Sequence, residues 1–231
     1  MNSSVKFWGI VPAAGVGKRM LADRPKQYLP LAGKTVIEHT LNRLLDSDVF
    51  EAIAVAISPE DPYWPELDIS KHPKILTTKG GKERADSVLS GLKFLEGHAA
   101  EDDWVLVHDA ARPCITSEDI NLLVKTLQAV EIGGILALPS HDTLKNVETN
   151  KITETIDRNR IWRALTPQMF RYSLLKNALL DAAEKQAVVT DESSAIELQG
   201  FHPEIISGRP DNIKITRPED LALAEFYMEQ Q

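Results

Sequence analysis

The sequence of 231 residues contains a single cysteine, Cys114. One thiol can form no disulfide within the chain, and it excludes zinc sites that are built from several cysteines. Cys114 follows Pro113 without an obvious catalytic partner, so it is also a weak candidate for a nucleophile. The cysteine content therefore fits a protein of a reducing compartment whose chemistry depends on other side chains.

Long apolar runs and excess positive charge are also absent. No apolar run approaches the roughly 20 residues that a membrane-crossing helix needs, and residues 1–6 lack the pattern of a cleaved signal, so we expect a cytoplasmic protein. Lys and Arg number 26 against 34 Asp and Glu, which gives a net charge of −8. This field repels polyanions, so we expect neither nucleic acid nor a membrane as a partner, and an anionic ligand needs a local basic site.

Short apolar runs alternate with longer segments of helical period, which is typical of βα units on a parallel sheet. We therefore predict an α/β fold: one domain over residues 1–231, with a Rossmann-like, mostly parallel sheet flanked by helices. Strands are expected at 7–11, 52–57, 75–77, 104–108 and 134–138, and helices at 36–45, 83–95, 118–130, 174–184, 192–198 and from 218 onward.

The segment from Ser140 to Trp162 breaks this pattern. It is polar, and its apolar residues alternate in a way that suits two strands turning near Asn150. An isolated hairpin is only marginally stable. We therefore expect an arm insertion at about 140–162 that packs on another surface, for which a second copy of the chain is one candidate.

A loop from Pro12 to Met20, rich in small residues, follows the first expected strand. Ligands of open α/β sheets bind at the carboxyl ends of strands, where small residues let backbone N–H groups approach a phosphate. Pro12 and Arg19 exclude a Walker A loop, and Met20 excludes a dinucleotide fingerprint. Residues 18–26 carry four cations, at Lys18, Arg19, Arg24 and Lys26, against the single acid Asp23. The loop is predicted to clamp an anion, and the alternative is a solvated loop with scattered charge.

Two further clusters follow expected strands. Residues 80–87 contain Gly80 and Gly81 before a helix N-terminus, which can offer backbone donors to a base, ribose or phosphate, or can be a plain turn and cap. Asp109 comes directly after the strand at 104–108, where a carboxylate can hold Mg²⁺ or can cap the following turn. His108 lacks a second histidine at metal-binding spacing, so we expect it to be structural.

A fourth cluster lies near the C-terminus, in residues 208–220. Asp211 and Lys214 could face the same phosphate and metal, whereas Thr216 and Pro218 read as an ordinary start to the last helix.

These four clusters, in this order, resemble the cytidylyltransferases that make sugar-alcohol diphosphate nucleotides, and most closely the 2-C-methyl-D-erythritol 4-phosphate cytidylyltransferase family. The resemblance runs from Val11 to Tyr227. Its most specific pieces are residues 12–20, 25–28, 81–88, 108–113, 165–168, 190–192 and 211–220.

The resemblance implies an enzyme that joins CTP to 2-C-methyl-D-erythritol 4-phosphate and releases pyrophosphate, in the non-mevalonate synthesis of isoprenoid precursors. It implies Mg²⁺ or another divalent cation as cofactor, and a homodimer in which the arm embraces the partner. Two alternatives stay open: a ribitol 5-phosphate cytidylyltransferase, and a catalytically silent nucleotide-sensing module on the same scaffold.

The clusters and the resemblance together give four sets of candidate site residues. The catalytic set is Arg19, Lys26, Arg158 and Lys214. The nucleotide-binding set is Ala13, Ala14, Gly15, Gly17, Lys18, Gly81, Lys82, Arg84, Ser87 and Ala110. The substrate-binding set is Asp109, Arg112, Thr143, Arg158, Thr166 and Asp211, and Asp109 is also the metal ligand. The resemblance implies that the arm carries Thr143 and Arg158 toward the neighbour's active site. Lys82 stands where some relatives have an acid, a change that a backbone contact should tolerate.

Overall fold

The fold is centred on one seven-stranded sheet in the order β11-β7-β10-β6-β1-β4-β5. The structure is a computed structural model, and it describes residues 5–15 and 23–231. All neighbouring strands of this sheet run parallel except at β10, which is antiparallel to both β6 and β7. The strands are β1 (Phe7–Pro12), β4 (Ala52–Ile57), β5 (Ile75–Lys79), β6 (Trp104–Val107), β7 (Gly133–Pro139), β10 (Trp162–Arg171) and β11 (Glu204–Ser207).

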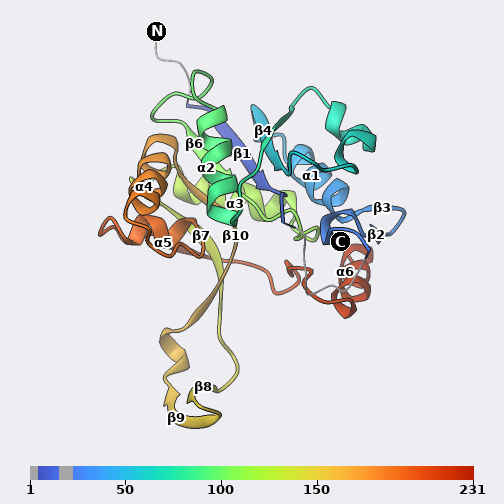
Figure 1. Cartoon of the computed structure of the whole chain (residues 1–231). Coiled ribbons are helices and arrows are strands. Elements are labelled where there is room, and N and C mark those ends of the chain that lie inside the picture. Colours follow the sequence, from blue (N-terminus) through green and yellow to red (C-terminus); the bar gives the residue numbers. More distant parts are fainter. Residues whose placement is uncertain (1–4, 16–22) are drawn as a thin grey trace.

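Helices cover both faces of the sheet (Figure 1). One face packs against α1 (Val36–Asp46) and α3 (Ser117–Leu127), and the other against α2 (Arg84–Phe94), α4 (Tyr172–Glu184) and α5 (Glu192–Glu197). Successive strand residues serve opposite faces, since Ile10 packs with the α2 side and Val11 with the α1 side. Burial on both faces is the reason why the strands are continuous apolar runs rather than alternating ones.

A third, smaller core anchors α6 (Glu219–Glu229) beside the short strands β2 (Pro30–Leu31) and β3 (Lys34–Thr35). Ile215 and Ala224 are fully buried there. Residues 208–218 therefore cross the carboxyl edge of the sheet, from the end of β11 to α6 (Figure 1). This crossing brings the predicted C-terminal cluster to the edge where ligands of α/β folds bind.

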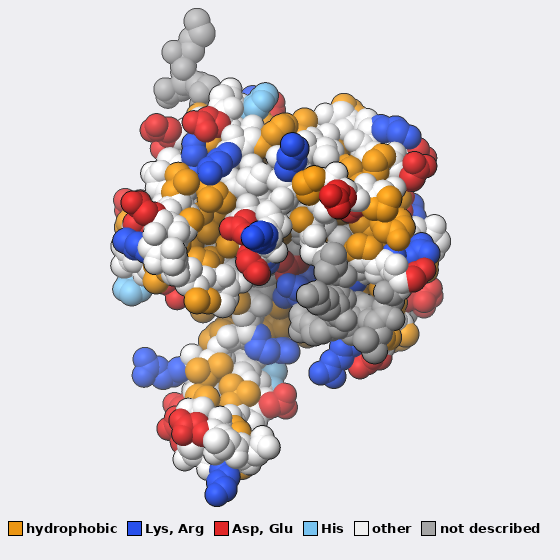
Figure 2. Space-filling view, viewed as in Figure 1, with side chains coloured by type: hydrophobic (Ala, Val, Ile, Leu, Met, Phe, Trp, Pro, Cys, Tyr) orange, Lys and Arg blue, Asp and Glu red, His pale blue; other side chains and the backbone are white. Residues whose placement is uncertain are grey.

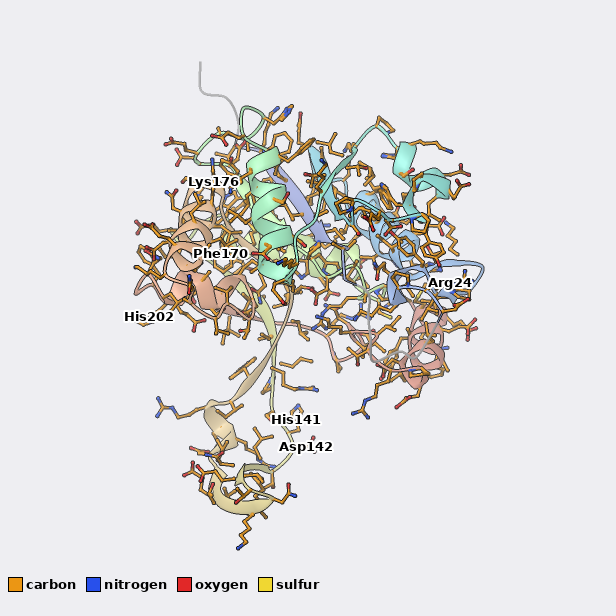
Figure 3. The ribbon with its side chains drawn as sticks, viewed as in Figure 1. Arg24, His141, Asp142, Phe170, Lys176 and His202 are labelled. Carbon is orange, nitrogen blue, oxygen red and sulfur yellow. The ribbon has the colours of Figure 1, made fainter. Side chains whose placement is uncertain are left out.

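The predicted arm is present as a hairpin of β8 (Leu144–Glu148) and β9 (Lys151–Ile156), whose turn has positive φ at Thr149 and Asn150. It extends away from the body, and His141 and Asp142 lie along it (Figures 1 and 3). Val147 and Ile152 are 52% and 64% exposed. The hairpin exists as expected, and its role in dimerisation stays a prediction.

The fold class is confirmed, and the predicted elements are present with shifts of up to three residues at their ends. Two strands of the main sheet, β10 and β11, were not predicted, and β5 is two residues longer than expected. In the described parts of the chain, no helix has both the length and the apolar character that crossing a bilayer requires.

Candidate active site

The predicted clusters meet in one pocket at the carboxyl edge of the sheet. Its walls come from the ends of β1, β5 and β6, from the N-terminus of α2 and from the segment that crosses to α6. The lining residues are Pro12, Ala13, Ala14, Gly15, Lys26, Gln27, Gly81, Lys82, Glu83, Arg84, Ser87, Asp109, Ala110, Ala111 and Lys214. Figure 2 shows that several Lys and Arg side chains lie on the side of the body that faces the arm.

Gln27 holds the backbone of the first loop through hydrogen bonds. Its buried side-chain amide donates to the carbonyl oxygens of Ala13, at 2.6 Å, and Gly15, at 3.1 Å. The amide thus satisfies two backbone acceptors of the loop. The sequence indicated Gln27 only as part of the motif at residues 25–28.

The second loop packs directly on the first. A Cβ at Gly80 would lie 2.3 Å from the Cβ of Ala14, so only glycine permits this approach. The backbone N–H of Gly81 donates to Ser87 Oγ at 3.0 Å, which ties the loop to α2. The described nucleotide-binding candidates of the two loops, Ala13, Ala14, Gly15, Gly81 and Lys82, thus line one space, and Ser87 holds the second loop in place.

Asp109 lies at the centre of the pocket's charge. It is only 6% exposed. Its Oδ1 lies 2.9 Å from Arg84 Nε, and its Oδ2 lies 2.8 Å from Lys214 Nζ and 3.4 Å from Arg112 Nε. Burial raises the pKa of Asp109, but the three cations outweigh it and hold the pKa well below the ordinary value. Asp109 is therefore ionised, and cations from three separate segments converge on it.

Lys26 extends the cationic side of the pocket. Its Nζ donates to the backbone carbonyl of Ile215 at 2.8 Å, which links the short helix after the first loop to the segment that carries Lys214. The structure thus brings together Lys26, Asp109 and Lys214, which sequence analysis had assigned to one centre. Ala110 follows Asp109 and lines the same pocket, as its assignment requires.

His108 and Thr166 support Asp109 from behind. The His108 Nε2 lies 3.1 Å from the carbonyl oxygen of Arg112, which can only accept, so Nε2 carries the proton of the neutral ring. Nδ1 then accepts from the Thr166 hydroxyl, which in turn accepts from the backbone N–H of Asp109, each at 3.1 Å. Burial lowers the pKa of His108 to about 4, which keeps the ring neutral. His108 is structural, as predicted.

A second depression adjoins the pocket and shares Arg84, Asp109 and Lys214 with it. Its other walls are Arg112, Ala164, Leu165, Thr166, Gln168, Thr190 and Asp191. Arg112 and Thr166, which were assigned to the acceptor substrate, therefore lie beside the nucleotide pocket rather than in it. The shared carboxylate and cations separate the two spaces.

Several assigned residues lie elsewhere. Asp211 pairs with Arg209 and accepts from Gln231, and it is absent from the lining of both spaces. Thr143 and Arg158 belong to the arm, where Arg158 donates to the carbonyl of His141 at 2.6 Å. Neither lines the pocket of its own chain. The assigned residues Gly17, Lys18 and Arg19 lie outside the described residues.

The charge network includes one residue to which sequence reasoning had given no role. Both carboxylate oxygens of Glu192 contact the two terminal nitrogens of Arg84, at 2.6 and 3.0 Å. Glu192 belongs to the motif at residues 190–192, which the family resemblance includes. Only its position in the fold, buried against α2, reveals its partner.

The donor set fits one type of metal site. Within residues 5–15 and 23–231, no group of three or more His, Cys, Asp or Glu side chains could hold a metal ion. Asp109 is a single buried carboxylate at the pocket wall. Mg²⁺ commonly takes one or two carboxylates and completes its shell with substrate phosphates and water, so Asp109 fits a divalent cation that arrives with a triphosphate.

Comparisons with known proteins cover nearly the whole chain and point to a single family. Residues 7–230 match the sequence profile of the 2-C-methyl-D-erythritol 4-phosphate cytidylyltransferase family. The protein of that name from Vibrio vulnificus is 53% identical over 231 residues, which cover 100% of this chain and 98% of the relative. The one from Vibrio cholerae is 54% identical over 220 residues, which cover 95% of this chain and 94% of the relative.

Solved structures agree with these sequence matches. A crystal structure of a 4-diphosphocytidyl-2C-methyl-D-erythritol synthase superposes with a TM-score of 0.86 at 37% identity, covering 98% of this chain and 100% of the other. The 2-C-methyl-D-erythritol 4-phosphate cytidylyltransferase of Francisella tularensis gives 0.85 at 37% identity, covering 96% and 99%. With its fold, pocket and sequence in agreement over nearly its full length, the chain belongs to the 2-C-methyl-D-erythritol 4-phosphate cytidylyltransferase family.

Proposed function

We propose that this chain transfers the cytidylyl group of CTP to 2-C-methyl-D-erythritol 4-phosphate and releases pyrophosphate, in the synthesis of isoprenoid precursors. The observation that carries the proposal is the convergence of Arg84, Arg112 and Lys214 on the buried Asp109, beside two loops of small residues. This arrangement supplies the positive charge and backbone donors that nucleotidyl transfer needs.

The reaction is an in-line displacement at the α-phosphorus of CTP. A phosphate oxygen of the acceptor forms the new bond, the bond from the α-phosphorus to the bridging oxygen breaks, and pyrophosphate leaves with that electron pair. The acceptor phosphate is its own nucleophile, so no strong general base is needed. This fits a pocket whose buried carboxylate is held ionised by cations.

Bringing two anions together is the main task of the site. Two unit charges about 4 Å apart repel by roughly 4 kcal/mol at an effective dielectric of 20. Lys26 and Lys214 lie on the wall of the nucleotide pocket, and Lys214 also borders the adjoining depression. They can therefore offset the charge of both substrates, and Arg19 of the first loop is assigned the same role.

A divalent cation, when bound, would neutralise charge on the phosphate oxygens of CTP. Asp109 would hold it, since it is the acid that both spaces share. The cytosine and ribose would then lie against residues 13–15, Gly81, Ser87 and Ala110. Arg112 and Thr166 would border the acceptor.

The arm supplies the last part of the proposal. Thr143 and Arg158 line neither space of their own chain, so we assign them to the acceptor site of a partner subunit in a homodimer. The exposed apolar residues of the arm, Val147 and Ile152, support this assignment because burial against a partner would stabilise the hairpin.

Pyrophosphate release by the purified chain tests the proposal. Release is expected with CTP, Mg²⁺ and methylerythritol phosphate, and it should fall sharply with ATP, GTP or UTP. Ribitol 5-phosphate in place of methylerythritol phosphate is expected to give little release. No release with any pair would refute the proposed activity, and faster release with ribitol 5-phosphate would change the acceptor.

A further inference from the structure

Glu192 is a buried acid that the proposed reaction does not use directly. It is 1% exposed and is the first residue of α5. Its two carboxylate oxygens accept from the two terminal nitrogens of Arg84, at 2.6 and 3.0 Å, and hold the end of the guanidinium. The two residues are 108 positions apart in the sequence. Burial raises the pKa of Glu192, and Arg84 partly offsets that effect. An acid buried at this cost needs a specific partner, and the described residues provide it in Arg84.

The pairing with Glu192 leaves some N–H groups of Arg84 without a hydrogen bond. A guanidinium has five N–H groups. Two contact Glu192, and the Nε–H contacts Asp109 at 2.9 Å. Two therefore remain without a hydrogen bond to the described residues, on a side chain that lines the nucleotide pocket. They lie on opposite edges of the guanidinium plane, one beside the Nε–H that contacts Asp109 and one beside Cδ, so at most one of them can be directed away from Asp109.

The same pairing also limits how the Arg84 guanidinium can bind Asp109. Without a partner at its end, the guanidinium could turn and bind Asp109 through two parallel hydrogen bonds, which is the preferred geometry of an Arg and carboxylate pair. Glu192 opposes this turn because it holds the end of the guanidinium through one N–H of each terminal nitrogen. Asp109 is left with a single contact from Arg84 on Oδ1, and its other oxygen faces Lys214.

Gln168 fixes the position of Glu192. Its side chain is 1% exposed, and its Nε2 donates to Asp191 Oδ2 at 2.8 Å, while its Oε1 accepts from the backbone N–H of Ser193 at 2.9 Å. The residues on both sides of Glu192 are therefore tied to β10. This connects the two motifs, at 165–168 and 190–192, that the site assignments had left without a common purpose.

Stability alone is a poor explanation for this arrangement. A buried ion pair often contributes little net stability, because desolvation offsets the attraction, and apolar residues of similar size can replace it. Here Arg84 of the pair also lines the nucleotide pocket and contacts the carboxylate of Asp109. Its position favours a role in orienting the site.

We propose that Glu192 is a positioning residue for cytidylyl transfer: it holds Arg84 so that its Nε–H meets Asp109 at the wall of the nucleotide pocket. The inference rests on the proposed function, because it takes the ligand of the pocket to be CTP. It adds Glu192 to the residues on which the reaction depends, although Glu192 itself touches no substrate.

The test compares Glu192→Gln with wild type. Glutamine has nearly the same shape, but its NH₂ would face a donor of Arg84, so the paired grip is lost. We expect kcat/KM for CTP to fall roughly 10- to 100-fold, the usual loss when an outer partner of a functional ligand is removed. Glu192→Asp keeps the charge at a shorter reach and is expected to fall between wild type and Glu192→Gln. Glu184→Gln, at an exposed acid at the end of the neighbouring helix α4, is the matched control and should leave kcat/KM unchanged.

The role of Arg84 is tested in a double-mutant cycle. In an Arg84→Met background, Glu192→Gln should cost little further activity, because the side chain through which it acts is already gone. Thermal unfolding and calorimetric titration with CTP accompany each variant, so that lost folding and lost nucleotide affinity are separated from slower turnover.

Two results would overturn the inference. One is folded Glu192→Gln and Glu192→Asp variants whose kcat/KM for CTP stays within about twofold of wild type, well under the loss expected for an outer partner. The other is an equal loss from Glu192→Gln with and without Arg84. Wild type that fails to turn over CTP would instead refute the proposed function, so the two failures are distinguishable.

Discussion

Lys214 and Asp109 form an ion pair, with 2.8 Å between Nζ and Oδ2, that joins the segment before α6 to the end of β6. Arg84 contacts the other carboxylate oxygen, so both oxygens of Asp109 are paired with cations. Because a carboxylate has about four lone-pair sites, a metal ion can bind Asp109 beside these cations or displace one of them. Lys214 is the more exposed of the two, with 35% of its side chain accessible against 26% for Arg84, which makes it the easier to move.

Replacing Lys214 by alanine is predicted to lower kcat on the order of 10²-fold, by analogy with the loss of one oxyanion donor. The charge that Lys214 provides to both substrates would be gone, although the fold should persist because the side chain is partly exposed. Steady-state pyrophosphate release measures the effect. Lys185→Ala removes a surface ion pair with Asp181 and serves as the control. Equal activity of the two variants would contradict the role of Lys214.

Thr166 provides a second prediction, about stability as well as rate. Thr166→Val keeps the shape but leaves the backbone N–H of Asp109 and the Nδ1 of His108 without their partner. Unsatisfied buried groups cost about 1–3 kcal/mol each. We expect a lower free energy of unfolding in urea and a lower kcat, both restored by Thr166→Ser. A valine variant that is as stable as wild type and only raises KM for the acceptor would show that Thr166 acts on the substrate alone.

The burial of His108 predicts a pH dependence of stability. Its pKa falls from 6.5 to about 4 in the folded chain, so between these values the unfolded chain binds a proton that the folded chain does not. Stability from this group is fully present above pH 6.5 and is lost as the pH falls toward 4, by at most about 3 kcal/mol.

Urea unfolding of the metal-free protein at several pH values measures this dependence. His108→Gln removes the titrating ring, so its free energy of unfolding should change less than that of wild type between pH 6.5 and 4. The same pH dependence in both proteins would show that His108 is not the group responsible.

The proposed reach of the arm can be tested by complementation. If Arg158 serves the partner's site, Arg158→Ala and Lys214→Ala homodimers each lack one residue at every site. Co-expression should produce mixed dimers in which one of the two sites has both residues, and about one quarter of wild-type activity should return, from the statistics of a two-fold assembly. Light scattering checks that the protein is a dimer. With both homodimers inactive, mixed dimers that also stay inactive would place Arg158 in its own subunit's site.

Much of the fold was predictable because apolar runs and helix caps are local signals. Thr35 and Thr116 form capping boxes with acids three residues later, at the starts of α1 and α3. Strands β10 and β11 gave weaker signals. The β10 segment mixes Arg163, Thr166, Pro167, Gln168 and Arg171 with its apolar residues, and β11 is an edge strand of four residues that is largely exposed. Their pairing depends on β7, which is distant in the sequence.

The site was predictable where residues follow strand ends. Asp109 follows the end of β6, at the edge of the sheet where ligands bind, and the short helix with Lys26 and the segment before α6 with Lys214 lie over the same edge. The partner of Glu192 was not predictable, since 108 residues separate it from Arg84 and only the tertiary fold brings the first residues of α2 and α5 together. The position of Asp211 was not predictable either, although its partner is close in sequence. Its carboxylate forms an ion pair with Arg209, two residues away, and the spacing between Asp211 and Lys214 does not indicate this pairing.

The measurement that tests the account most directly is steady-state turnover of CTP by Asp109→Asn. Cations of three segments converge on Asp109, and the proposed function assigns the nucleotide and a divalent cation to the same carboxylate. It predicts that this nearly isosteric change lowers kcat on the order of 10²-fold or more, in a variant that circular dichroism shows to be folded. A folded Asp109→Asn variant that turns over within about threefold of wild type, well under that loss, would contradict it.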